Sequence, residues 1–281
     1  MKIIDCHTHL QTKELINEYN LNGNYAISIK ALKSLIGNGN KFYRAVNDFD
    51  NIFIVECIDA NKSIRKQLNK IEKRLKRINK IVGIKIYLGY QSIYANDEKL
   101  YPIYYFALKH NLTIVFHCGV GSENLKDGFG SAYADASKIE DVAKYFPSVK
   151  FVASHFNEPD FESCANLVLN YDNVFTDISG GLENVTNKPS DIVVAEYVNK
   201  IEPLIKKYKD TNLYKKVMFG TDFFGAASGF GFKDEYVLVL KKLFKKECMD
   251  NLLFINCLNA YPKIKQIIKY QNLRRKYWIK L

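Results

Sequence analysis

Short apolar segments alternate with amphipathic helical patterns along most of the chain, and few folds can accommodate such a repeat. Eight of these segments are rich in β-branched residues and apolar almost throughout, which is typical of strands buried on both faces of a parallel sheet. They cover Lys2–Asp5, Tyr25–Ile29, Ile52–Ile58, Ile81–Tyr87, Leu112–His117, Val149–Ser154, Val174–Ile178 and Val217–Thr221. Eight β–α alternations in a row predict a closed (β/α)8 barrel, a TIM barrel, rather than a doubly wound sheet.

Helical patterns follow most of the expected strands. The clearest runs from Lys62 to Lys80, with apolar residues three and four apart on one face and basic residues on the other. Further helices are expected at Glu98–His110, Ala136–Tyr145, Phe161–Leu169, Asp191–Tyr208 and Asp234–Lys245. We predict a single domain over residues 1–281, with the barrel over about 1–246 and extra C-terminal helices packed outside it over about 247–281.

Four of the five histidines stand at or just after the C-terminal end of an expected strand. In a TIM barrel this end carries the active site. His7 and His9 are two residues apart after the first strand, so both rings can face the barrel mouth. His117 ends the fifth strand, His155 the sixth, and Asp222 the eighth. Three imidazoles and a carboxylate with an open position describe a catalytic zinc site.

Seven short motifs in a fixed order carry a resemblance to a known family. They are Ile4-Asp5-Cys6-His7-Thr8-His9, Gly83-Ile84-Lys85-Ile86-Tyr87, Phe116-His117-Cys118-Gly119, Phe146-Pro147 followed by Ala153-Ser154-His155-Phe156, Thr176-Asp177-Ile178-Ser179, Gly220-Thr221-Asp222-Phe223 and Asn259-Ala260. With them the chain resembles the amidohydrolase superfamily of metal-dependent barrels. Within that superfamily it is similar to the amidohydrolase-related (amidohydrolase 2) branch, which contains small hydrolases and non-oxidative decarboxylases.

The resemblance implies a ligand set and two catalytic residues. His7, His9, His117 and Asp222 would bind one divalent metal ion, for which zinc is our first expectation and manganese, iron and cobalt are alternatives. Such an ion lowers the pKa of a bound water from about 16 towards 7. Asp222 would accept the proton of this water and pass it to the leaving group. His155 would hold the nucleophile or polarise the substrate oxygen.

Lys85, inside the expected fourth strand, leaves two alternatives. In binuclear members of the superfamily that the chain resembles, a lysine from this strand is carboxylated and bridges two metal ions, and His117 and His155 would then bind the second. Otherwise Lys85 contacts the substrate or is a buried cation with a lowered pKa. Glu56 and Asp177, near the ends of the third and seventh strands, could also face the pocket or serve the structure.

The resemblance implies a metal-dependent hydrolase that uses a metal-activated water to cleave an amide, ester or lactone in a small molecule. The alternative is a metal-dependent non-oxidative decarboxylase of a small aromatic or unsaturated acid. It is weakened because no arginine lies near an expected strand end, which leaves Lys30 and Lys85 as cations. A metal-dependent deoxyribonuclease fits less well. Those barrels carry Gly-Glu and Glu-Thr-Asp motifs where this chain has Gly83-Ile84-Lys85 and Gly220-Thr221-Asp222.

The net charge of +11 does not by itself indicate nucleic acid. Only six of the 41 basic residues are arginine, the residue that usually supplies bidentate phosphate and base contacts. We therefore expect a small-molecule substrate and no nucleic-acid partner, and a homo-oligomer stays open. No apolar run approaches the ~18 residues of a membrane span, and the N-terminus lacks a signal-peptide pattern, so we expect no membrane partner and a cytoplasmic location.

Overall fold

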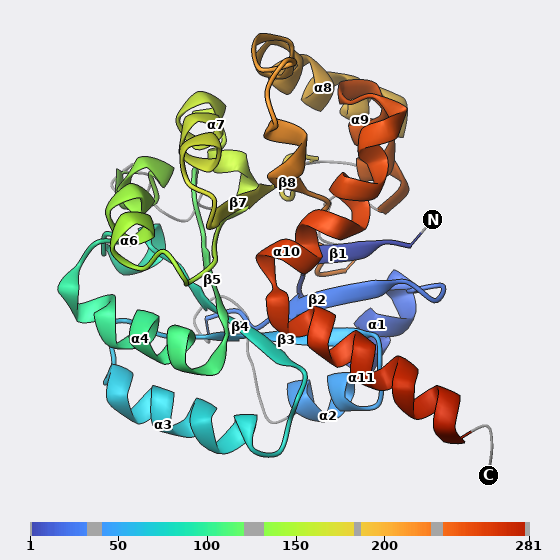
Figure 1. Ribbon diagram of the computed structural model, residues 1–281. Helices are drawn as coiled ribbons and strands as arrows, with labels where there is room; N and C mark the ends of the chain where they lie inside the picture. The colour runs from blue at the N-terminus through green and yellow to red at the C-terminus, as the bar shows by residue number, and fades with distance from the viewer. Residues whose placement is uncertain (1, 33–40, 121–131, 183–186, 226–232, 279–281) are drawn as a thin grey trace.

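The computed structural model describes residues 2–32, 41–120, 132–182, 187–225 and 233–278. Eight parallel strands follow one another around a single sheet in sequence order (Figure 1). They are β1 Ile4–Thr8, β2 Tyr25–Ile29, β3 Ile52–Cys57, β4 Ile81–Ile86, β5 Thr113–Phe116, β6 Phe151–Ala153, β7 Val174–Asp177 and β8 Val217–Met218. The expected TIM barrel is therefore confirmed.

The barrel closes through the segment that follows β8 rather than through β8 itself. Phe219 O accepts a hydrogen bond from Cys6 N over 3.0 Å, and Asp222 N donates to His7 O over 2.7 Å. These bonds bring Asp222 beside β1. Strand β8 ends at Met218, earlier than the apolar run suggested. The residues after Met218 no longer pair with β7, because their backbone groups bond to β1 instead.

Helices surround the strands (Figure 1). They are α1 Lys13–Tyr19, α2 Lys41–Asn47, α3 Ile64–Leu75, α4 Tyr101–His110, α6 Glu140–Tyr145, α7 Phe161–Asn170, α8 Ser190–Lys207, α9 Lys233–Leu243, α10 Asn256–Ala260 and α11 Pro262–Trp278. Of the two short helices α1 and α2, only the first was not expected, because Arg44 of α2 lies on a helical pattern. The first is delimited by its ends, because Thr12 accepts a hydrogen bond from Leu15 N and Asn20 adopts a left-handed conformation at its C-terminus.

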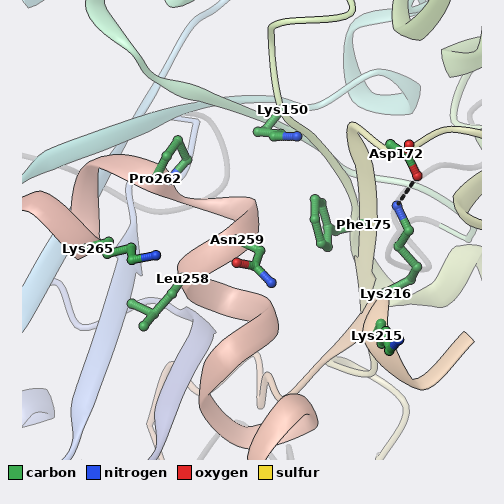
Figure 2. A pocket seen from close by; sticks show the side chains of 9 residues that line it. All are labelled: Lys150, Asp172, Phe175, Lys215, Lys216, Leu258, Asn259, Pro262 and Lys265. Atoms are coloured by element: carbon green, nitrogen blue, oxygen red, sulfur yellow. Dashed lines mark ion pairs between the residues drawn. The ribbon is translucent and has the colours of Figure 1, made fainter. Parts of the chain in front are cut away.

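The barrel interior is apolar and is covered at its N-terminal end by α10 and α11. Cys257, Tyr261 and Ile264 from these helices pack against inward residues of the strands, including Phe175 of β7. Figure 2 looks at this end, where α10 lies beside β7. The expected extra C-terminal helices thus cover the end of the barrel opposite the strand-end histidines.

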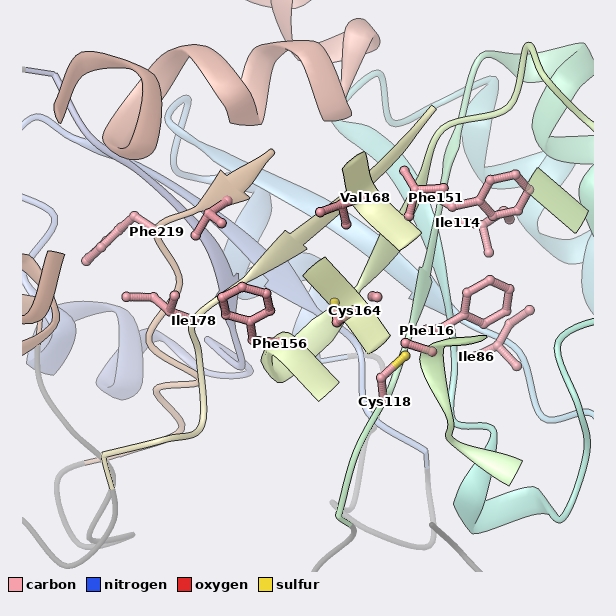
Figure 3. Packing of buried hydrophobic residues seen from close by; sticks show 14 of the residues in the cluster. Ile86, Ile114, Phe116, Cys118, Phe151, Phe156, Cys164, Val168, Ile178 and Phe219 are labelled. Atoms are coloured by element: carbon pink, nitrogen blue, oxygen red, sulfur yellow. The ribbon is translucent and has the colours of Figure 1, made fainter. Parts of the chain in front are cut away.

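A larger apolar layer lies between the strands and the surrounding helices. Phe116 and Phe151 on neighbouring strands stack there, and Cys164 and Val168 of α7 pack in the same layer (Figure 3). Burial of this layer fixes the strands, and so positions the loops at the C-terminal end. No helix in the described ranges is long and apolar enough to span a membrane.

Candidate metal centre

His7 and His9 turn the same ring nitrogen toward Asp222. The distance from Asp222 Oδ1 is 3.3 Å to His7 Nε2 and 3.1 Å to His9 Nε2. A tetrahedral metal with ligands at ~2.0–2.1 Å separates its ligand atoms by about 3.3 Å, so these three atoms have the spacing of a zinc site. The three residues form one of two groups of described residues whose ligand atoms all lie within 4.8 Å of one another.

The proton positions in this group also fit a metal. His9 Nδ1 donates to Ile29 O over 2.8 Å, which fixes its hydrogen on Nδ1, and His7 Nδ1 lies 3.3 Å from Asp177 Oδ2. Burial, together with the charge of Lys85, lowers the pKa of His7 to about 4, so its ring is neutral at neutral pH.

Neutral His7 with its hydrogen on Nδ1 presents a lone pair at Nε2 to the Asp222 carboxylate. Oδ1 of Asp222 is buried, and no donor among the described residues makes a hydrogen bond to it. Two electron-rich atoms in contact need a cation between them, and a neutral imidazole Nε2 with its Nδ1–H engaged is the usual metal-binding form.

His117 and His155 face each other rather than Asp222. His155 Nε2 lies 3.2 Å from His117 Nδ1. His117 Nε2 lies 3.2 Å from Val120 O, and His155 Nδ1 lies 3.1 Å from Ser179 O. His117, which the resemblance places with His7, His9 and Asp222, belongs to neither group of described residues with convergent ligand atoms.

Asp177, at the end of β7, contacts both His7 and His155. Its Oδ2 faces His7, and its Oδ1 accepts hydrogen bonds from the backbone N–H groups of His155 and Ser179, both over 3.1 Å. The hydroxyl of Ser179 also donates to Oδ1. Burial alone would raise the pKa of Asp177, but the contacts with His7, His155 and Ser179 outweigh it and hold the pKa well below its usual range.

Ser179 was not singled out in the sequence, although it stands in the Thr-Asp-Ile-Ser motif. Its Oγ lies 3.1 Å from His7 Nδ1 and 3.0 Å from His155 Nδ1, so one hydroxyl contacts both rings. A buried serine two residues beyond a strand gives no periodic signal. Only its neighbours in space show its position.

The backbone is strained where the site residues lie. His155, Phe156 and Asn157 are consecutive residues with φ of 62°, 47° and 57°, and Asp222 has φ of 60°. L-residues rarely adopt this left-handed conformation, and such strain concentrates at functional sites. Here it follows β6 and β8 at the points that direct His155 and Asp222 into the barrel mouth.

Lys85 points into the barrel because β4 contains an irregularity. Ile54 pairs with Ile81 but Val55 pairs with Gly83, so Val82 is an extra residue, and both Val82 and Lys85 face inward. Lys85 is fully buried, and its Nζ donates to Ser154 Oγ over 2.9 Å. Burial lowers its pKa to about 8, although the charges of Asp177 and Asp222 oppose this shift.

Glu56 and Lys30 lie outside this group. Glu56 is buried on the helix side of β3, where Arg74 binds both of its carboxylate oxygens at 2.6 and 3.0 Å and Tyr43 donates to it. Lys30 Nζ donates to the same Tyr43 hydroxyl over 2.9 Å. Of the two alternatives for Glu56, the structural one applies, because strand alternation turns its side chain away from the interior.

Aromatic rings border the histidines. The ring centre of His117 lies 5.1 Å from that of Tyr90 and 5.9 Å from that of Tyr87, which stacks on it. His9 lies 6.3 Å from Phe224. Substrate that reaches the histidines would therefore meet flat apolar surfaces.

Known proteins resemble this chain in sequence pattern and in fold. A family model described as amidohydrolase matches residues 4–245. Curated protein sequences give no match.

Solved structures share the fold at low sequence identity. A probable 2-pyrone-4,6-dicarboxylic acid hydrolase from Acinetobacter baumannii is 14% identical with a TM-score of 0.67, covering 93% of this chain and 100% of its own. A 4-oxalomesaconate hydratase from Rhodopseudomonas palustris is 13% identical, with a TM-score of 0.65 over 97% of this chain and 99% of its own. A 5-carboxyvanillate decarboxylase from Sphingomonas paucimobilis is 12% identical with a TM-score of 0.54, and the match covers 89% of this chain and 82% of its own.

Proposed function

The chain belongs to the amidohydrolase family, and from this premise we propose that it is a metal-dependent hydrolase that cleaves a small amide, ester or lactone. The observation that carries the proposal is the convergence of His7 Nε2, His9 Nε2 and Asp222 Oδ1 at the spacing of tetrahedral metal ligands. We assign these atoms to one divalent metal ion, with zinc as the first candidate and manganese, iron or cobalt as alternatives. His117 would complete the set by turning from His155.

The metal would supply the nucleophile by lowering the pKa of a bound water towards about 7. Asp222 would accept the proton of that water and return it to the leaving group. His155 Nδ1 lies 3.1 Å from Ser179 O, and its Nε2 is the ring nitrogen on the side of His117. We assign His155 to hold the attacking water or to polarise the substrate oxygen.

Lys85 acts on this site through its positive charge and does not contact the substrate. It has no exposed surface, and its ammonium group is hydrogen-bonded to Ser154. The positive potential it adds beneath the metal would favour an anionic substrate or transition state. A carboxylated Lys85 that bridges two metals is the competing assignment, and the 3.2 Å separation of His117 and His155 would suit the second metal.

A metal-dependent non-oxidative decarboxylase of an aromatic or unsaturated acid is the second candidate. The rings of Tyr87 and Tyr90 beside His117, with Lys85 buried nearby, favour it because they suit a flat anion. The names of the similar structures, a dicarboxylic acid hydrolase and a carboxyvanillate decarboxylase, point to acids in both reaction classes. We also propose that the substrate is a small molecule and that the protein acts in the cytoplasm.

Elemental analysis of the purified protein tests the proposal. We expect about one equivalent of a transition metal, lost in a His7→Ala, His9→Ala double variant and retained in His110→Ala, whose histidine lies on α4 away from the centre. No metal after reconstitution would contradict the mechanism, and about two equivalents would make Lys85 a bridge. A screen of esters, lactones, amides and aromatic acids then separates hydrolysis from release of carbon dioxide.

A further inference from the structure

A pocket of about 450 Å³ opens at the N-terminal end of the barrel (Figure 2). Lys150 directly precedes β6, Lys216 directly precedes β8, and Pro262 begins α11. The pocket thus lies at the end of the strands opposite the histidines and Asp222. Its volume falls within the range of ~300–1,000 Å³ in which proteins bind small molecules.

The lining of the pocket carries a strong positive charge. The lining contains four lysines and one carboxylate: Lys150, Lys215, Lys216, Lys265 and Asp172. Asp172 is fully exposed and its nearest oxygen lies 3.9 Å from Lys216 Nζ, so solvent screens this pair. The described lining therefore has an excess of three positive charges with little internal compensation.

One lysine is held in place by the fold. Lys216 is only 13% exposed, and its Nζ donates to the backbone oxygens of Tyr171 over 3.1 Å and Val174 over 3.5 Å. The same ammonium lies 4.9 Å from the ring centre of Phe175, and Lys150 Nζ lies 6.0 Å from that ring. A fixed cation loses little side-chain entropy when it binds an anion.

The positive charge of Lys150 disfavours the charged form of Lys216. Burial lowers the pKa of Lys216, and the charge of Lys150 lowers it further against the opposing effect of Asp172. An anion bound in the pocket would offset this repulsion and raise the pKa of Lys216 again, so the free site favours a negatively charged occupant.

We propose that this pocket binds a small, multiply charged anion of the di- or triphosphate type. Lysine ammonium groups act as point charges and lack the planar fork with which arginine grips one carboxylate. A lining made of lysines therefore binds an anion more tightly the more negative charges the anion carries. The lining is made of few residues, which suits a small anion, whereas nucleic acid would need a longer basic face.

Calorimetric titration of the metal-loaded protein with inorganic diphosphate tests the proposal, with acetate as the singly charged comparison. We expect saturable one-site binding of diphosphate, weakened about tenfold or more in a Lys150→Ala, Lys265→Ala double variant. Lys216 is kept, because it also anchors the backbone before β7. The control is Lys66→Ala, Lys70→Ala, which removes the same charge from the exposed face of α3 and should change the affinity by less than about twofold.

Four results would overturn the proposal. Diphosphate that does not saturate below about 10 mM would be an adventitious ion only. Equal weakening by both double variants would show general attraction to a basic protein. Binding that Lys150→Ala, Lys265→Ala leaves unchanged would place diphosphate on the metal centre. Binding of a DNA duplex that competes with diphosphate and depends equally on both lysine pairs would assign the charge to a nucleic-acid surface.

Discussion

The backbone N–H of His155 donates a hydrogen bond to Oδ1 of Asp177 over 3.1 Å. This bond ties the left-handed segment after β6 to the last residue of β7. The second oxygen of the same carboxylate faces Nδ1 of His7, so one aspartate sets both the position of His155 and the tautomer of His7.

Replacement of Asp177 by asparagine should weaken metal binding about 10- to 100-fold, because an amide cannot accept at both of its terminal atoms. The asparagine NH₂ group is a donor, and in either orientation it would face another donor. That donor is the Nδ1–H of His7 or the backbone N–H groups that now bond to Oδ1. Zinc affinity measured by chelator competition checks this. Asp210→Asn, an exposed aspartate outside the site, serves as the control, and equal affinities in the two variants would contradict the assignment.

Gly180→Ala should disturb His155 as well as the backbone. Gly180 has φ of +79°, and a Cβ there would lie 2.8 Å from His155 Nδ1. We expect a loss of about 1–2 kcal/mol in stability and a fall in kcat of about tenfold or more.

Gly23→Ala is the matched control for that substitution. Gly23 has a similar φ of +77°, but a Cβ there meets nothing within 4 Å. It should lose a similar free energy of unfolding with kcat unchanged, and equal kcat losses in the two variants would show that the effect is not local to His155.

Lys85→Met should stabilise the metal-free protein at neutral pH. Lys85 has a pKa of about 8 in the fold against 10.5 for an ordinary lysine, so the unfolded chain binds more protons between these values. Below pH 8 the buried charge lowers the free energy of unfolding by its full amount, about 3 kcal/mol. This loss disappears as the pH rises to about 10.5.

Urea unfolding of both proteins in EDTA, at about pH 7.5 and pH 10, checks this prediction. The advantage of Lys85→Met should shrink at the higher pH. Lys66→Met, on the exposed face of α3, should show no such dependence. A Lys85→Met protein less stable than the wild type at neutral pH would mean that the charge of Lys85 is needed by Asp177 and Asp222.

Removal of the metal should lower the thermal stability. Zinc at 100 times its dissociation constant adds about 2.7 kcal/mol to the free energy of unfolding, which corresponds to about 5 °C or more in Tm. Differential scanning calorimetry with EDTA, and then with added zinc, measures the change. The His7→Ala, His9→Ala variant should show no zinc-dependent shift, and a shift as large as that of the wild type would place the metal elsewhere.

Much of this architecture follows from local pattern. The apolar strand segments and the helical periodicity between them predict the barrel, because each strand is buried on both faces and each helix on one. The same pattern places His7, His9, His117, His155 and Asp222 at one end, since the carboxyl ends of parallel strands in a barrel meet there. The short helix α1 carries too few turns to show a period.

The sequence by itself determined the fold and the end of the barrel at which chemistry-bearing residues gather. Only the tertiary structure decided which of them meet. The extra residue at Val82 turns Lys85 inward, and the left-handed segment after β6 sets His155 against His117 and Ser179. Periodicity is a property of neighbours along the chain. Bulges, strained turns and shared acceptors such as Asp177 are stabilised by residues distant in sequence, so no local pattern contains them.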